Sequence, residues 1–173
     1  MNYKNTIKKI SIAMVLLLTF AACSDDDNEI IPTQPNIVEL AIATPELSSL
    51  VAALTTADLV NTLNGDGPFT VFAPTNEAFA TFLSDNDFAT LDDVPVEVLQ
   101  EVLLYHVVSG EIASSDLTNP GNTIAMTVQG EDLTVTMPEA TITDATGVTD
   151  IGITVVDIEA SNGVVHLIDK VML

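Results

Sequence analysis

The chain contains no arginine and little positive charge of any kind. Its 173 residues carry 4 Lys+Arg against 25 Asp+Glu, and Lys4, Lys8 and Lys9 precede the first apolar run. From residue 23 onward, Lys170 is the only basic side chain among 25 acids. Lys and Arg are the side chains that bind phosphates and that anionic lipid headgroups attract. The composition therefore excludes nucleic-acid and nucleotide binding and attraction to anionic headgroups.

Cysteine is nearly absent, since Cys23 is the only one, and this excludes an internal disulfide. The basic stretch Met1–Lys9 and the apolar run Ile10–Ala22 are typical of a signal peptide, because spanning a bilayer takes about 20 apolar residues. Ala21-Ala22-Cys23 resembles the lipobox of bacterial lipoproteins. The resemblance implies a signal peptide at residues 1–22 and acylation of Cys23, for example by palmitate. A plain secretory signal is the alternative.

Residues 23–35 form an acidic stretch that contains two prolines and predicts a flexible stalk. Ser24-Asp25-Asp26-Asp27 resembles the acidic export signal of some Gram-negative lipoproteins. We therefore expect a lipid anchor in the outer membrane with the domain exposed at the cell surface. A solvated acidic spacer on a periplasmic protein is the alternative.

Tryptophan is absent, and Tyr105 is the only tyrosine after the signal segment. Sugars usually stack on the rings of these two residue types, so the sequence does not favour a sugar-binding platform. The phenylalanines of the domain cluster along the chain and predict core packing instead. They are Phe69, Phe72, Phe79, Phe82 and Phe88.

Residues 36–173 show no repeat and no second linker, which predicts a single domain. Its first half has mostly helical periodicity. Helices are expected at Ile37–Ala43, from Pro45 through Leu54, after Thr75, and from Pro95 to Ser109-Gly110; Asp58–Leu63 forms a short turn and Phe69–Ala73 a strand. The second half is Thr/Val/Ile-rich and predicts strands at Thr123–Val128, Asp132–Met137, Ala140–Thr143, Ile151–Val156, Ile158–Ala160 and Val164–Ile168. Helices followed by strands indicate the α+β class.

Three segments resemble the signatures of the fasciclin (FAS1) domain family, and they occur in the family's order. They are Thr70–Phe79, Leu103–Val108 with its Tyr-His pair, and Gly163–Leu173. The resemblance covers residues 36–173 and implies a β-sandwich or wedge of about seven strands with a helical layer. It also implies an extracellular adhesion or matrix module, which in bacteria is secreted or lipid-anchored. The integrin-binding motifs of animal members are not visible here.

The resemblance assigns structural roles to most signature residues and a partner-binding role to Tyr105 and His106. The structural set is Thr70, Phe72, Pro74, Thr75, Asn76, Phe79, His106, His166 and Asp169. His106 and His166 are too few for a zinc site, which needs three or four ligands. We expect His106 to hydrogen-bond to the backbone or to Asn76.

Calcium is the more reasonable metal because it prefers oxygen ligands, and the acids are dense at two places. These places are Asp85–Asp87 with Asp92-Asp93, and Asp144 with Asp150. Neither matches an EF-hand loop, so solvated acidic loops are the favoured interpretation and no metal or cofactor is predicted.

The sequence favours a protein that is not an enzyme. It lacks Gly-x-Ser-x-Gly, a phosphate loop, a dinucleotide fingerprint and His-Glu-x-x-His. The leading hypothesis is a lipid-anchored adhesion module that binds matrix, cell-surface or glycan partners. One alternative is an envelope protein that binds a small hydrophobic molecule or glycan in a cleft lined by Tyr105-His106. A hydrolase, which requires a perturbed carboxylate or Ser-His pair in a cleft, is the third.

Overall fold

A computed structural model of the chain describes residues 34–117, 123–136, 140–148 and 150–173. The predicted signal peptide, residues 1–22, and Cys23 lie outside the described residues. So does the predicted stalk up to residue 33. Residues Pro32–Leu173 belong to one compact unit.

Helices dominate the first half of the described chain, as the periodicity predicts. Asn36 caps the first helix in a reciprocal capping box with Glu39, and the Thr75 hydroxyl accepts a hydrogen bond from the Ala78 N–H at the start of another. The helical segments are α1 (Ile37–Ala43), η1 (Pro45–Leu47), α2 (Ser48–Thr56), α3 (Val60–Leu63), α4 (Asn76–Asp85), η2 (Leu91–Asp93), α5 (Val96–Tyr105) and α6 (Ser114–Leu117).

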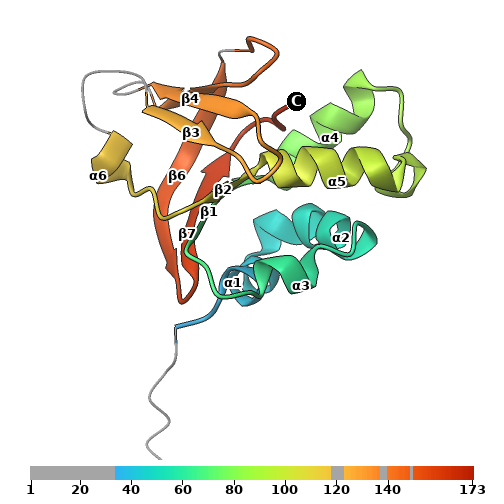
Figure 1. Ribbon diagram of the computed structural model, residues 1–173. Coiled ribbons are helices and arrows are strands. Elements are labelled where there is room, and N and C mark those ends of the chain that lie inside the picture. The colour runs from blue at the N-terminus through green and yellow to red at the C-terminus, as the bar shows by residue number, and fades with distance from the viewer. Residues whose placement is uncertain (1–33, 118–122, 137–139, 149) are drawn as a thin grey trace, which may run out of the picture. The chain divides into compact units, whose positions relative to one another are not determined.

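One mixed sheet of 7 strands, in the order β2-β1-β7-β6-β5-β4-β3, lies beside these helices (Figure 1). β1 and β7 are parallel and the other neighbouring pairs are antiparallel. An isolated bridge between Val108 and Thr127 connects the two ends of the sheet, so the sheet curls back on itself. The strands are β1 (Phe69–Pro74), β2 (Val107–Ser109), β3 (Thr123–Met126), β4 (Asp132–Thr136), β5 (Thr141–Thr143), β6 (Ile151–Ala160) and β7 (Gly163–Ile168).

The neighbouring strands β1 and β7 are buried on both faces. Along β1, Val71 and Ala73 pack with the helices, whereas Phe72 points to the other side, into a cluster that draws residues from every strand. β7 divides in the same way, with Val165 on the helical side and Ile168 on the other. Strands covered on both faces are mostly apolar, which explains why these segments show no regular polar alternation.

The α+β prediction of about seven strands agrees with the structure, but two of the strands differ from the expected ones. The helix that opens after Pro95 ends at Tyr105 and not at Ser109, because the backbone from Val107 pairs with β1. The segments expected as two strands at Ile151–Val156 and Ile158–Ala160 form one bulged strand, β6. Local periodicity does not reveal that a segment pairs with a strand far upstream in the sequence, such as β1. It also does not show that a bulge joins two expected strands into one.

No single helix in the described ranges is long and apolar enough to cross a membrane. The segments Ile37–Ala43 and Pro45–Thr56 meet the criterion only together, across a bend of 107°.

Candidate functional site

The three signature segments meet at His106. Its Nδ1 lies 2.6 Å from the Val102 carbonyl oxygen, and its Nε2 accepts a hydrogen bond of 3.0 Å from the Met172 N–H. Because Nε2 accepts, the ring proton sits on Nδ1 and is donated to Val102. The His106 carbonyl accepts a bond of 2.9 Å from the Phe72 N–H. One residue therefore joins α5, β1 and the C-terminal segment.

His106 is buried and held in its neutral form. Burial lowers the pKa of its imidazole from 6.5 to about 4, against smaller opposing effects of the Val102 carbonyl and the Asp144 carboxylate. A charged ring would also turn Nε2 into a donor facing the Met172 N–H. The geometry requires a neutral imidazole.

We expect this shift to make the fold sensitive to acid. As the pH falls below 6.5 the unfolded chain takes up the proton first, so unfolding becomes more favourable until the pH reaches about 4. The difference in pKa corresponds to about 3 kcal/mol. The variant His106→Phe keeps a ring at this position but cannot titrate. The wild type and the variant have the same carboxylates, so the effects of carboxylate protonation cancel when the two are compared. Urea unfolding at several pH values should show the stability advantage of the wild type shrinking by this amount from pH 6.5 to about 4. A constant difference would contradict the assignment.

Tyr105 is buried beside His106. Its hydroxyl accepts a hydrogen bond of 2.7 Å from the Ala145 N–H and lies 3.4 Å from the Asp132 carbonyl oxygen, so it ties the end of α5 to the second half of the sheet. Burial raises the pKa of its phenol above the ordinary value of 10. With 2% and 1% of their surfaces exposed, Tyr105 and His106 offer no contact area to a partner in this conformation.

His166 and Phe72 stack between β7 and β1, with ring centroids 5.5 Å apart. The His166 Nδ1 accepts a bond from the Asp157 N–H, and Nε2 donates to the Ile112 carbonyl at 2.9 Å. Thr70 closes the same region, because its hydroxyl donates to Gly110 O and accepts from Ile112 N–H. These contacts fix the loop that follows β2.

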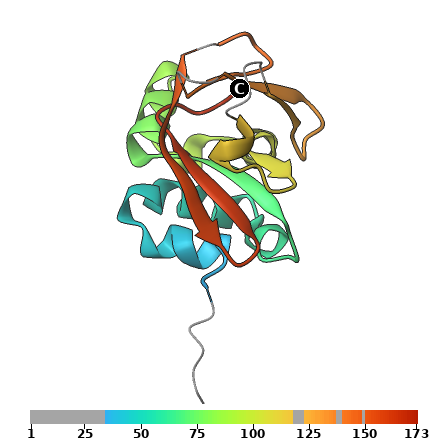
Figure 2. The same ribbon diagram turned by 90° about the vertical axis from the view of Figure 1, so that its left-hand side faces the viewer.

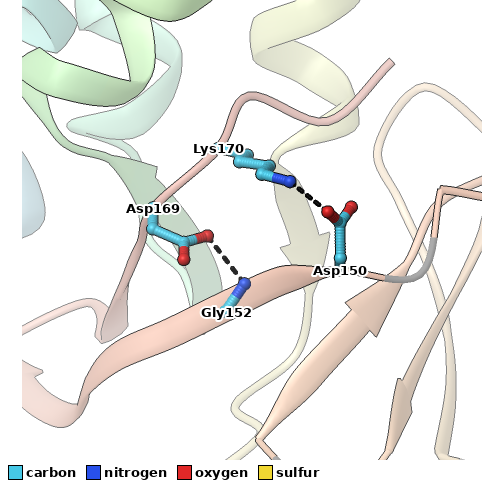
Figure 3. Close-up of polar contacts among 4 residues, drawn as sticks. All are labelled: Asp150, Gly152, Asp169 and Lys170. Atoms are coloured by element: carbon cyan, nitrogen blue, oxygen red, sulfur yellow. Dashed lines mark hydrogen bonds and ion pairs between the residues drawn. The ribbon is translucent and has the colours of Figure 1, made fainter.

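Asp169 and Lys170 lie where β7 ends, and each contacts the start of β6 (Figure 3). The Asp169 carboxylate accepts a bond of 2.7 Å from the Gly152 N–H. Lys170 forms an ion pair with Asp150, which raises the pKa of the lysine and lowers that of the aspartate. Both side chains of the ion pair are solvent-exposed, so the pair contributes little to stability.

The remaining signature residues connect β1 to the helices. Pro74 ends β1 opposite Ile168, and the Thr75 N–H donates to the Ile168 carbonyl. Asn76 accepts from the Ser49 N–H and donates to the Pro45 carbonyl, so it bonds to the α2 region and not to His106. Phe79 is buried among the helices.

At each of the two acidic places considered for calcium, one carboxylate is used for local structure. Asp144 accepts bonds from the N–H groups of Thr146, Val148 and Leu173. Asp93 caps the turn at Thr90. Within the described ranges, no group of three His, Cys, Asp or Glu residues is placed to hold a metal ion.

A serine–histidine pair would need a histidine nitrogen free to accept a hydroxyl proton. Both nitrogens of each histidine are engaged by backbone groups. Ser114 instead hydrogen-bonds to Asp157, and these bonds lower the pKa of that carboxyl. This arrangement joins the start of α6 to β6.

The hollows near the Tyr-His pair are small. His106 lines an internal space of about 10 Å³, and the groove that Tyr105 lines holds about 200 Å³. Ligand clefts usually hold about 300–1,000 Å³. A larger groove of about 320 Å³ lies between α4 and the C-terminal segment, lined in part by Phe82, Lys170 and Leu173.

Sequence reasoning missed one surface feature, the outward part of β6. Val155 and Val156 are 44% and 40% exposed although they are neighbours in a strand. A regular strand would turn one of them inward. The signal in the sequence is the loss of alternation at Val155-Val156-Asp157, which by itself is typical of the end of a strand.

Comparison with known proteins finds the Fasciclin domain over residues 45–173. The protein sll1735 of Synechocystis is 38% identical over 140 residues, covering 80% of this chain and 98% of its own length. The cell surface glycolipoprotein MPB83 of Mycobacterium bovis is 33% identical over 147 residues, covering 81% of this chain and 61% of its own. None of these names is that of an enzyme.

Among solved structures, a FAS1 domain pair from the insect cell adhesion molecule Fasciclin I superposes with a TM-score of 0.66 at 19% identity. The match covers 82% of this chain and 51% of that one. The predicted FAS1-like fold is thereby confirmed.

Proposed function

Because this chain belongs to the Fasciclin domain family, we propose that it is a non-enzymatic adhesion module at the bacterial cell surface, anchored through a lipid on Cys23. Its partners would be matrix proteins, cell-surface proteins or glycans. Support comes from the relatives, which include a cell surface glycolipoprotein and a cell adhesion molecule.

The observation that carries the proposal is the internal use of the signature side chains. Phe72, Tyr105, His106 and His166 are each 2% exposed or less, and their polar atoms bond to the protein's own backbone. A site that performs chemistry needs groups that reach a substrate. Here the signature builds a scaffold, and contact with partners falls to the surface.

The alternative of a small-ligand protein is less well supported by the geometry. The expected cleft at Tyr105-His106 reduces to the spaces of about 10 and 200 Å³ described above. The groove of about 320 Å³ beside α4 is large enough for a ligand, but neither Tyr105 nor His106 lines it.

Lipid anchoring gives a direct prediction for Cys23→Ser. The hydroxyl cannot replace the acylated thiol, so the protein should move from the membrane fraction to the soluble fraction. Fractionation with immunoblotting and labelling with a palmitate analogue would measure the change. Ser24→Ala is the matched control and should stay in the membrane fraction. Retention of Cys23→Ser in membranes would refute the anchor.

Adhesion is tested with cells that carry the full chain and with otherwise identical cells that lack it. Both are applied to surfaces coated with matrix proteins, host glycans or bacterial polysaccharide, with calcium and with chelator. The proposal expects more bound cells when the chain is present, and equal binding with and without chelator. Equal attachment of both strains on every surface would refute an adhesive role.

A further inference from the structure

The outer half of β6 is an open edge of the sheet. β5 pairs with β6 only at Gly152 and Ile151, and the Ile153 N–H reaches the Ala140 carbonyl. Beyond that point, no strand in the described ranges pairs with β6 on the side away from β7. Thr154 to Asp157 and Glu159 are exposed. The Asp157 N–H is used, because it donates to His166 Nδ1, but the other outward backbone polar groups of this edge have no strand partner in the described ranges and are available for pairing with another strand.

The same edge presents apolar side chains. Val155 and Val156 rank among the exposed large apolar residues of the domain. Their joint exposure follows from the irregular pairing between Val155 and Ile158, where Asp157 adopts a φ of 56°. Apolar surface beside open backbone groups is the combination that strand addition uses, with main-chain bonds for affinity and side-chain contacts for selectivity.

The charges on the edge select the partner. Asp157 and Glu159 carry negative charge there, and Asp116 lies on α6, whose first residue Ser114 bonds to Asp157. Acidic residues on an edge strand repel copies of a chain that has 25 acids and 4 basic residues. They attract a segment of opposite charge, so the residues that prevent self-association favour a basic partner.

A polar groove continues from the end of β6. It holds about 550 Å³ and is lined by the β6–β7 turn together with Asp66 and Glu111. The β6–β7 turn lies beside α1 (Figure 2). Asn162 holds it in place by accepting a hydrogen bond from the Ile37 N–H and donating one to the Leu63 carbonyl. A segment that runs along β6 past Glu159 reaches this groove, where the two carboxylates can accept a lysine or arginine side chain.

We infer that the open edge of β6, residues 154–159, docks an extended basic segment of a partner protein by strand addition. The inference rests on the proposed adhesive function and names the chemical class of its partner. Apolar residues of the segment pack on Val155 and Val156, and its cationic residues face Asp157, Glu159 and the adjoining groove.

The test uses a synthetic peptide that alternates lysine with valine and threonine, and a control peptide with glutamate in place of lysine. Binding to the segment Pro32–Leu173, which contains every residue that the structure describes, is measured by fluorescence anisotropy. Glu159→Lys should weaken the affinity for the basic peptide by roughly tenfold. Glu97→Lys on the exposed start of α5 makes the same change in net charge and should weaken it much less. Val156→Thr should weaken binding of the basic peptide more than Val96→Thr does. Val96 is a matched control because the two valines are similarly exposed, Val156 at 40% and Val96 at 42%.

Backbone amide shifts in the NMR spectrum locate the peptide and are expected at residues 154–159. Equal effects of Glu159→Lys and Glu97→Lys, shifts elsewhere, equal binding of both peptides or no binding would each overturn the inference. Self-association of the protein at this edge would overturn it too. Cells that carry Glu159→Lys separate the two proposals. If these cells adhere as well as wild-type cells, the proposed site at the β6 edge is refuted and the proposed adhesive function is not. Absence of adhesion by wild-type cells refutes the function itself.

Discussion

Replacing Gly163 with alanine is expected to prevent stable folding, with a loss of more than about 4 kcal/mol. Gly163 begins β7 at a φ of 154°, and an added Cβ would lie 1.9 Å from the Phe69 carbonyl oxygen. That oxygen belongs to the backbone of β1, which is fixed by pairing with both β2 and β7. Relief would require β1 and β7 to separate, and both hydrophobic cores include residues of these two strands.

Gly130→Ala is the matched control. Gly130 also has a positive φ, 103°, but nothing lies within 4 Å of an added Cβ. It should lose only about 1–2 kcal/mol from backbone strain. Urea unfolding followed by circular dichroism measures both variants. Similar losses for the two would show that the close contact at Phe69 is relieved easily.

Phe72→Ala is expected to cost about 3–5 kcal/mol. The Phe72 side chain is fully buried in the cluster that draws from every strand, and it stacks on the His166 ring. Its removal leaves a cavity that the surrounding β-strands cannot close, because they are fixed by pairing.

Phe88→Ala is the comparison, since Phe88 is only partly buried against the helical core. It should lose clearly less stability in the same unfolding experiment. A loss at Phe72 no larger than at Phe88 would contradict the account of the strand core.

Much of the helical half could be predicted because its signals are local. Thr75 marks the start of a helix in the sequence, and the α1 boundaries match the expected Ile37–Ala43. The end of α5 could not be predicted, because Val107 and Val108 suit a helix face equally well. Their pairing with Val71 and Thr70 of β1 decides the outcome, and pairing between distant segments leaves no local signal.

The candidate site could likewise be predicted only in part from the sequence. The signatures identified Phe72, His106 and His166 from the sequence, and the resemblance gave them structural roles. It also suggested that Tyr105 and His106 meet a partner, but their burial leaves no surface for that contact. The open edge of β6 escaped prediction because exposure depends on where β5 stops pairing, at Gly152. Residue types alone do not encode that position.

If the signature residues build the scaffold and the surface makes the contacts, His106→Phe should change stability but not adhesion. Adhesion by cells that carry His106→Phe is measured at a temperature where circular dichroism shows the variant folded. We expect a lower unfolding temperature, because the Met172 N–H loses its acceptor, together with wild-type adhesion by the folded protein. Loss of adhesion with an unchanged unfolding temperature would contradict it.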